Sequence, residues 1–202
     1  MSARKVLIIV SRNKKKKDEI LRILRGFDIK ALGIDEVDAS LPVIIEDGKT
    51  FKQNAIKKAV IVSKIIDGLI LADDSGLIVD CLDGKPGVRS SRFAHAKATD
   101  DENCRKLLKL MQGIPSESRT ATFICGVAVA NKGILLDYAE GSCKGSILYE
   151  RKGAEGFGYD SVFIPDGYKS TFAEIMPASK DKMSHRAEAL KKVKEVIQKY
   201  FS

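Results

Sequence analysis

Hydrophobic residues along the chain recur at two spacings, one typical of buried strands and one typical of helices with a single apolar face. Residues 6–10, VLIIV, form an unbroken apolar run of the kind found in strands that are covered on both sides. Over residues 18–27 the apolar positions recur at helical spacing, and the same period returns over 50–66, where Thr50 is placed to cap a helix. The chain therefore opens with a strand, a short loop and a helix.

Further along, short apolar runs bounded by turn residues predict more strands, and helical spacing returns twice. The predicted strands are 42–46, 68–72, 77–79, 119–130, 133–139 and 142–148. The predicted helices are 101–111 and about 184–200. Residues 73–76, DDSG, are predicted to form a turn, and the last three strands resemble an antiparallel meander. Polar residues 113–118 separate a helix-rich half from a strand-rich half, so they mark the predicted boundary between two lobes.

Composition narrows the class of protein. The 202 residues are 44% hydrophobic and 31% charged, which excludes a disordered or fibrous chain and predicts one soluble globular domain. With 35 Lys and Arg against 27 Asp and Glu, the net charge is +8. The longest stretch without a charged residue, 120–131, is well short of the roughly 20 residues of a membrane helix, so no membrane partner is expected.

The four cysteines, Cys81, Cys104, Cys125 and Cys143, include no CxxC pair, and the sequence has only 2 histidines. A zinc site is therefore not expected. Cys81 and Cys125 fall in apolar runs, where a free cysteine behaves as a small core residue. This pattern, and the shortness of the apolar run at 6–10 compared with a signal-peptide core, predict a cytoplasmic protein.

Residues 12–17, RNKKKK, place five cations at the start of a predicted helix. A helix N-terminus carries partial positive charge, so each cation there costs about 0.3–1 kcal/mol before screening. A bound phosphate would offset this repulsion, and a strand–loop–helix junction commonly binds phosphate. Taken alone, the run is more often a solvated surface. No GxxxxGK[ST] motif occurs, which excludes a P-loop.

Three further clusters contain chemically active side chains. Asp73 and Asp74 end an apolar run, and because successive strand residues point to opposite faces, one carboxylate can face a cleft while the other supports it. Carboxylates at a strand end suit Mg²⁺, and Glu46 is a third acid that could reach the same ion, although a structural DSG turn is the commoner case. Residues 156–160, GFGYD, could present an aromatic ring to a flat ligand or pack under a loop. His185 and Arg186 offer directional donors that suit the oxygen and N7 edge of a purine, although a lone histidine is more often structural.

The order of these clusters resembles the inosine triphosphate pyrophosphatase family, hydrolases that remove nonstandard purine nucleoside triphosphates. The resemblance rests on residues 11–16, 46–59, 71–77, 84–88, 156–160, 171–174 and 184–186. It implies an α/β fold with a long central mixed β-sheet flanked by helices, and a single two-lobed catalytic domain over 1–202 with a substrate cleft between the lobes. It also implies a homodimer and Mg²⁺-dependent hydrolysis to a nucleoside monophosphate and pyrophosphate.

Matching positions carry the family's site residues onto this sequence. The phosphate-binding residues implied are Ser11, Arg12, Asn13, Lys14, Lys15, Lys16 and Lys58. Glu46 and Asp74 are the implied metal ligands, with Asp74 also the catalytic proton acceptor and Ser75 beside the substrate. The implied contacts to the nucleoside and base are Phe157, Gly158, Tyr159, Asp160, Lys180, His185 and Arg186.

The sequence departs from the family pattern at three places. Ser11-Arg12 replaces the usual Thr-Gly, Gln53 replaces a common Glu, and Ser161 follows Asp160 where proline is usual. Arg12 matters most, because a bulky cation replaces a residue that lets the backbone approach phosphate closely. This departure leaves open the alternative that the protein is a divergent family member that binds nucleotides without cleaving them.

Base selectivity follows from the 6-position of the purine. A 6-oxo group accepts hydrogen bonds from His185 and Arg186, whereas the amino group of adenine leaves donors facing each other, at a cost of about 1–3 kcal/mol. This argument excludes ATP, whereas guanine shares the 6-oxo group, so the rejection of GTP requires a further feature at C2 that the sequence does not reveal. ITP, dITP and XTP are the expected substrates. The rival class is a nucleic-acid-binding module that uses the +8 charge, but such a module needs neither DDSG nor GFGYD, and no stable nucleic-acid partner is expected.

Overall fold

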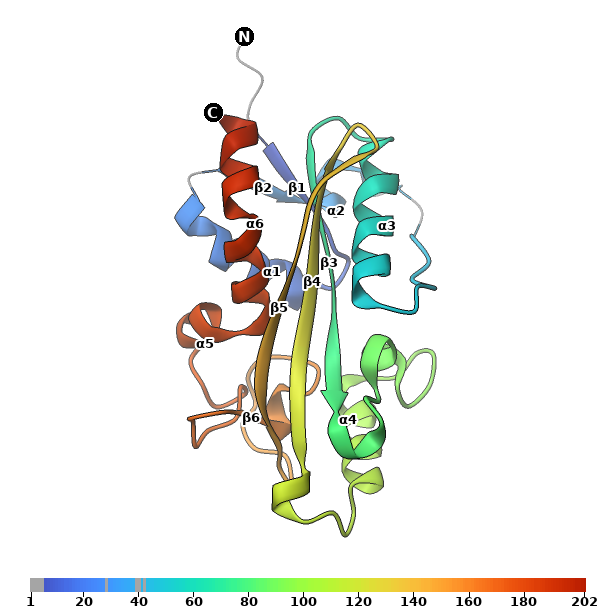
Figure 1. Ribbon diagram of the computed structural model, residues 1–202, viewed down its shortest axis with the longest axis vertical. Helices are drawn as coiled ribbons and strands as arrows, with labels where there is room; N and C mark the ends of the chain where they lie inside the picture. Colours follow the sequence, from blue (N-terminus) through green and yellow to red (C-terminus); the bar gives the residue numbers. More distant parts are fainter. Residues whose placement is uncertain (1–5, 28, 39–40, 42) are drawn as a thin grey trace. The chain divides into compact units, whose positions relative to one another are not determined.

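The computed structural model describes residues 6–27, 29–38, 41 and 43–202, and its strands form one six-stranded sheet in the order β2-β1-β3-β4-β5-β6 (Figure 1). The strands are β1 (Val6–Val10), β2 (Lys30–Gly33), β3 (Leu69–Val79), β4 (Thr120–Asn131), β5 (Ile134–Ile147) and β6 (Phe163–Pro165). β1 pairs in parallel with both β2 and β3, whereas β5 and β6 are antiparallel. The sheet is therefore mixed, which confirms the predicted α/β class.

The helices are α1 (Lys14–Leu24), α2 (Ile34–Val37), α3 (Phe51–Ser63), α4 (Asp100–Leu110), α5 (Pro177–Met183) and α6 (His185–Phe201). The four predicted helices are confirmed as α1, α3, α4 and α6. Thr50 caps α3 as predicted, because its side chain accepts the N–H of Gln53. α1 begins at Lys14 instead of Asp18, because the Asn13 side chain accepts the N–H of Lys16 and so caps a helix that includes all four lysines.

The chain divides into two compact units that interleave along the sequence. Unit 1 comprises Met1–Asp74, Cys125–Gly141 and Arg186–Ser202, and unit 2 comprises Ser75–Ile124 and Ser142–His185. The predicted boundary at 113–118 is wrong, because these residues lie inside unit 2 and connect α4 to β4. The chain instead passes from one unit to the other within β3, β4, β5 and α6, where no polar linker marks the change.

Unit 1 has an apolar layer on each face of its strands, as the unbroken run of β1 predicts. Leu7 and Ile9 belong to a cluster with residues of α1 and α6, whereas Ile8 and Val10 belong to a cluster with residues of α3. Figure 1 shows α1 and α6 on one side of the strands and α3 on the other. Strand alternation therefore sends neighbouring side chains toward different helices.

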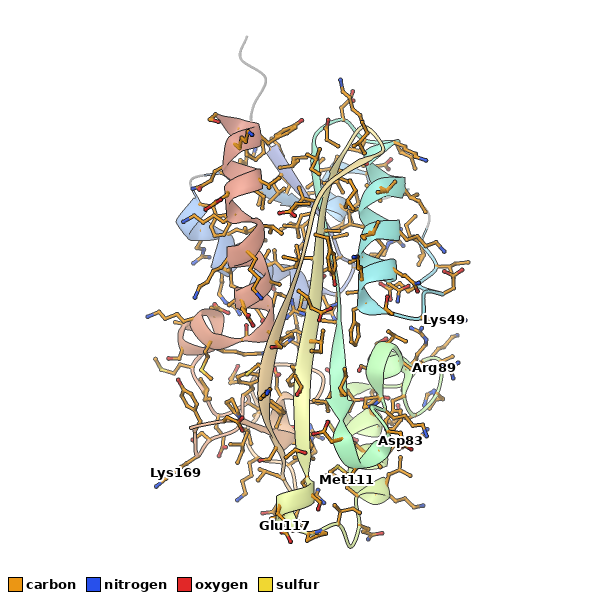
Figure 2. The ribbon with its side chains drawn as sticks, viewed as in Figure 1. Lys49, Asp83, Arg89, Met111, Glu117 and Lys169 are labelled. Carbon is orange, nitrogen blue, oxygen red and sulfur yellow. The ribbon has the colours of Figure 1, made fainter. Side chains whose placement is uncertain are left out.

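Unit 2 has one main core, built where α4 and the aromatic residues of β4 and β6 meet. The rings of Phe123 and Phe163 lie edge to face with centroids 4.7 Å apart, and Leu107 of α4 is fully buried in the same cluster. Arg119, 2% exposed, donates to the carbonyls of Ile147 and Met111, which ties the end of α4 to β5. Figure 2 shows Met111 and the turn residue Asp83, whose φ of 53° is followed by a positive φ at Gly84.

Several predicted strands are wrong in extent. Residues 68–72 and 77–79 were expected on either side of a turn, but they form the single strand β3, with 73–76 extended inside it. The predicted strands 133–139 and 142–148 are likewise merged into the single strand β5, which begins at Ile134 and ends at Ile147. Residues 43–46 have no regular structure, and Pro42 lies outside the described residues. The short elements β2, α2, α5 and β6 carry too few residues for their periodicity to be visible.

All four cysteines are free thiols in the structure. Cys125 is buried in unit 1, as predicted. Cys81 is exposed, so its assignment to the core is wrong: it lies on a short 3₁₀ turn, Asp80–Leu82, that follows β3. Within the described part of the chain, no helix is long and apolar enough to cross a membrane.

Candidate active site

The loop between β1 and α1 is the predicted phosphate loop, and its residues have distinct surroundings. The Ser11 hydroxyl donates to the carbonyl of Asn13, whose side chain caps α1. Lys14 and Lys15 are exposed, whereas Lys16 and Lys17 are partly buried. The cations of the run therefore do not act as one equivalent cluster.

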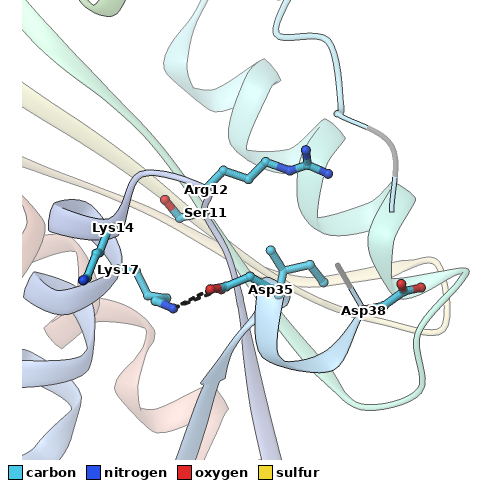
Figure 3. Close-up of a pocket in the computed structure, with 7 residues that line it drawn as sticks. Ser11, Arg12, Lys14, Lys17, Asp35 and Asp38 are labelled. Carbon is cyan, nitrogen blue, oxygen red and sulfur yellow. Dashed lines mark hydrogen bonds and ion pairs between the residues drawn. The ribbon is translucent and has the colours of Figure 1, made fainter. Parts of the chain in front are cut away.

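Lys16 and Lys17 form ion pairs with different acids. The Lys16 ammonium lies 3.2 Å from the Asp73 carboxylate on β3, whereas Lys17 lies 2.9 Å from Asp35 and 3.4 Å from Glu36. The contact with Asp35 is drawn in Figure 3. Hydrogen bonding to Asp35 raises the pKa of Lys17 despite partial burial. Of the two neighbours, only Lys16 is held beside the DDSG segment.

A pocket of about 410 Å³ adjoins this loop in unit 1. Its lining comprises Ser11, Arg12, Lys14, Lys17, Ile34, Asp35 and Asp38 (Figure 3). Arg12 is exposed and donates to the carbonyl of Leu41. The arginine that replaces the family's usual glycine therefore ties the loop to residue 41.

Asp73 and Asp74 are consecutive residues of β3, and their side chains have separate partners. Asp73 Oδ2 contacts Lys16 and the Arg186 guanidinium, with Cys125 Sγ 3.9 Å away. Asp74 Oδ2 accepts a hydrogen bond of 2.8 Å from the amide of Asn54 on α3. The expected alternation of the two carboxylates is thus confirmed, inside a strand and not in the predicted turn.

Asp74 lies in a buried group of polar side chains supplied by α3 and the loop before it. The Lys58 ammonium donates to the Glu46 carboxylate and, at 2.5 Å, to the backbone carbonyl of Asp73. Burial raises the pKa of Asp74, and the charge of Glu46 adds to the rise, while Lys16, Lys58 and the Asn54 hydrogen bond oppose it. The result is a carboxyl group with a stronger affinity for a proton than an exposed aspartate has.

Lys58 remains charged in these surroundings. Burial alone would lower its pKa, but the charges of Asp73, Glu46 and Asp74 outweigh that effect and raise it. Lys58 is thus a buried cation whose charge is balanced by neighbouring carboxylates. Its predicted role as a phosphate contact is compatible with this position and stays a prediction.

The acids around Asp74 fit a magnesium ion. The Glu46 carboxylate pairs with Lys58 and its charge raises the pKa of the nearby Asp74, and carboxylate oxygens are the ligands that Mg²⁺ prefers. Among the described residues there is no group of three or more His, Cys, Asp or Glu side chains placed to hold a metal. Two carboxylates suffice for Mg²⁺ when substrate phosphate and water complete its ligands.

In unit 2 the predicted base-binding residues centre on an ion pair. Lys180 and Asp160 are both nearly fully buried, with their charged atoms 2.6 Å apart. Asp160 also accepts the N–H of Phe157, and the Lys180 ammonium lies 4.9 Å from the centroid of the Phe157 ring. Gly156 has a φ of 77°, and a Cβ there would lie 2.2 Å from the Asp160 carboxylate, which explains the glycine.

Three predicted base contacts have structural partners that the sequence did not reveal. The Tyr159 hydroxyl is buried and donates to the carbonyl of Ser90, so this side chain packs in the core of unit 2. His185 stacks on Phe123, with ring centroids 4.7 Å apart and planes 8° from parallel. The Arg186 guanidinium contacts Glu19 and Asp73 in unit 1. The role of His185 and Arg186 as donors to the purine stays a prediction.

Asn54, Glu19 and Asp73 are candidate functional residues to which the sequence assigned no specific role. A signal existed for Asn54, since asparagine is disfavoured inside a helix and here it bridges Asp74 and the N–H of Gly48. For Glu19 the only signal was an acid next to the apolar residue Ile20. Its partner, Arg186, lies 167 positions away, so no local pattern could connect them.

The fold is α/β, lysines lie at the start of α1, two acids are consecutive on β3, and α3 contributes a buried lysine. These features define an α/β protein that binds and acts on phosphate compounds. Comparison with known proteins makes the assignment specific. The Ham1 family model matches residues 7–196, and the chain belongs to this family.

Curated relatives support the same assignment. A dITP/XTP pyrophosphatase of Oceanobacillus iheyensis is 42% identical over 186 residues, covering 92% of this chain and 94% of that protein. A dITP/XTP pyrophosphatase of Desulforamulus reducens is 44% identical, covering 96% of both chains. The solved structure of the Staphylococcus aureus Ham1 protein has a TM-score of 0.84 and 31% identity, covering 97% of this chain and all of that one.

Proposed function

We propose that this protein hydrolyses nonstandard purine nucleoside triphosphates, dITP, ITP and XTP, to the nucleoside monophosphate and pyrophosphate. The observation that supports this most directly is the surroundings of Asp74: a buried carboxyl group with a raised pKa, held by Asn54 and close to Glu46 and Lys58. The relatives named dITP/XTP pyrophosphatase, matched over nearly the full chain, support the choice of substrate.

The reaction places negative charge on the departing pyrophosphate. Lys16, at the N-terminus of α1, and the buried Lys58 would stabilise that charge as it develops, because both ammonium groups are fixed before the substrate arrives. Mg²⁺ bound by Glu46 and Asp74 would neutralise charge on the triphosphate. We propose this ion as the cofactor because the carboxylate donors suit it.

Asp74 is proposed to act on the attacking water. Its raised pKa makes it a better proton acceptor than an exposed aspartate, and the Asn54 amide fixes the direction of one of its oxygens. One carboxylate cannot be a full-strength metal ligand and a base together. We therefore assign Asp74 to the metal first and to proton transfer second.

Unit 2 supplies the groups proposed to recognise the base. Lys180 and His185 are donors that suit a 6-oxo purine, and the half-buried Phe157 offers a ring for stacking. An adenine amino group would face these donors without an acceptor, which disfavours ATP by about 1–3 kcal/mol. The homodimer implied by the family resemblance and the cytoplasmic location predicted from the sequence stay predictions.

The test is pyrophosphate release from a panel of ITP, dITP, XTP, GTP and ATP, with and without Mg²⁺. We expect release from the first three, well above GTP and ATP, and loss of release when the metal is chelated. Asp74→Asn should lose most of the turnover while substrate still binds. Equal turnover of ATP and ITP would exclude the proposed base selectivity, and near-normal turnover by Asp74→Asn would remove Asp74 from the reaction.

A further inference from the structure

Asp73 is a fully buried acid adjacent to Asp74, and the proposed function assigns it no role. Its side chain is 1% exposed, and its Oδ2 lies 3.2 Å from the Lys16 ammonium and 3.3 Å from a nitrogen of Arg186. Arg186 contacts Glu19 at 3.0 Å through its other terminal nitrogen. The four side chains form a chain of charges within unit 1, which we call the Asp73 relay: Glu19, Arg186, Asp73 and Lys16.

Stability alone does not account for this relay. Glu19, Arg186 and Asp73 are each only 1% exposed, and a buried ionic group of this kind is often no more stable than apolar residues of similar volume. Asp73 Oδ1 is buried and has no hydrogen-bond partner among the described residues. A buried polar atom left unsatisfied is rare and calls for an explanation beyond packing.

Lys16 needs such an anchor because a lysine side chain is long and flexible. The next residue, Lys17, pairs instead with Asp35 of α2. Asp73 fixes Lys16 toward β3, where the charge of Lys16 also acts on the neighbouring Asp74. The cation thus lies near the proposed catalytic acid.

We propose that Asp73 is a positioning residue for Lys16, and that Glu19, through Arg186, holds Asp73 in place. This inference rests on the proposed function, because it takes Lys16 to be the cation that stabilises the departing pyrophosphate. Asp73 acts through Lys16 and does not itself touch the substrate. The Asp73 carboxylate holds the Lys16 ammonium in one direction until a polyphosphate takes the place of Asp73 or binds the same ammonium beside it.

The test is a double-mutant cycle with Asp73→Asn and Lys16→Met, measured by the kinetics of dITP hydrolysis. Asp73→Asn should lower kcat about 10- to 100-fold, as expected when a catalytic group is displaced by about 1 Å. KM should stay the same or fall, because the change removes a negative charge near an anionic substrate. In the Lys16→Met background the same change should cost less than about 3-fold, because Lys16 is no longer there to be positioned.

A matched control separates positioning from a general loss of stability. Arg119→Lys alters a buried arginine of unit 2 that donates to backbone carbonyls and is remote in sequence from Lys16. Any loss of activity that it causes should be the same in both backgrounds. An equal loss from Asp73→Asn in both backgrounds, or a raised KM with unchanged kcat, would overturn the proposal.

If Asp73→Asn does not fold, Asp73→Glu replaces it in the cycle. The glutamate keeps the charge balance of the relay but lengthens the side chain by one methylene, so it should displace Lys16 with a smaller loss, about 3- to 10-fold, that disappears with Lys16→Met. Wild-type activity in this variant would contradict the positioning role.

A binding measurement distinguishes failure of this inference from failure of the proposed function. Calorimetric titration with inorganic tripolyphosphate requires no catalysis and no base. We expect Lys16→Met to weaken binding, and Asp73→Asn to change binding by a different factor with Lys16 present than without it. If the wild type hydrolyses no triphosphate but this coupling is found, the proposed function fails and the positioning role stands. Tripolyphosphate binding that does not depend on Lys16 refutes the positioning role.

Discussion

At the scale of single residues, Asn54 shows how one amide can prepare a catalytic acid. It donates to Asp74 at 2.8 Å and accepts the N–H of Gly48 at 2.8 Å, so both ends of the amide are fixed. Asn54→Ala should lower kcat about 10-fold with little change in KM, because Asp74 loses the contact that orients it while the phosphate-binding cations remain.

The neighbouring residue provides the control for this change. Gln53 lies in the same turn of α3, and its side chain accepts the N–H of Lys49 in an exposed position. Gln53→Ala removes one side-chain hydrogen bond near the helix start without touching Asp74, so kcat should stay within about 2-fold of wild type. Steady-state kinetics of both variants with dITP measure the difference, and equal losses would show that the helix start, not the amide, is responsible.

Single residues also show where the sequence is informative and where it is not. The alternation of Asp73 and Asp74 follows from strand geometry and is correct, even though the segment was expected to be a turn. Their partners could not be predicted, since Arg186 lies 113 positions from Asp73. Ionic partners across such separations depend on topology, which a single sequence does not display.

At the scale of elements, the start of α4 combines two reciprocal contacts. Thr99 accepts the N–H of Glu102, and the Glu102 carboxylate accepts the N–H and hydroxyl of Thr99. These hydrogen bonds, together with His95, lower the pKa of Glu102 to about 2. The ionised form is therefore favoured by folding, so the carboxylate contributes stability above about pH 4.5 that is lost as the pH falls toward 2.

Glu102→Gln should therefore lower the free energy of unfolding at neutral pH, and its difference from wild type should shrink as the pH falls from about 4.5 toward 2. Urea denaturation at a series of pH values measures this. Thr99→Ala serves as the comparison: it removes a cap that does not titrate, at a cost of about 1 kcal/mol that should persist in acid. A Glu102→Gln difference that is unchanged in acid would show that the charge of Glu102 is not involved.

Elements were predictable where an apolar pattern extends over the whole element. The unbroken apolar run predicts β1, and apolar residues at helical spacing predict the helices α1, α3, α4 and α6. β3 was divided in two because the polar segment Asp73–Gly76 has the composition of a turn. In the folded protein those acids pair with Lys16 and Asn54, so tertiary contacts replace the local hydrogen bonds that favour a turn.

At the scale of the whole molecule, two compact units share a continuous chain that passes between them four times. Each passage lies within a strand or helix: three are within β3, β4 and β5, and the fourth is at the start of α6. A boundary of this kind has no sequence signal, because linkers are recognised by polar, Pro-rich or Gly-rich composition and none is needed here. The notion of one catalytic domain over 1–202 stays a prediction that folding experiments can test.

The test compares two fully buried leucines of equal size, one in each unit. Leu190 of α6 lies in a core cluster of unit 1, and Leu107 of α4 lies in the core of unit 2. Each change to alanine should cost about 2–5 kcal/mol. Because three strands contribute to both cores, we expect one cooperative transition in both variants, with amide protection lost together in hydrogen exchange. Two separate transitions, with Leu190→Ala releasing only unit 1 and Leu107→Ala releasing only unit 2, would mean that the units fold independently and that 1–202 contains two domains.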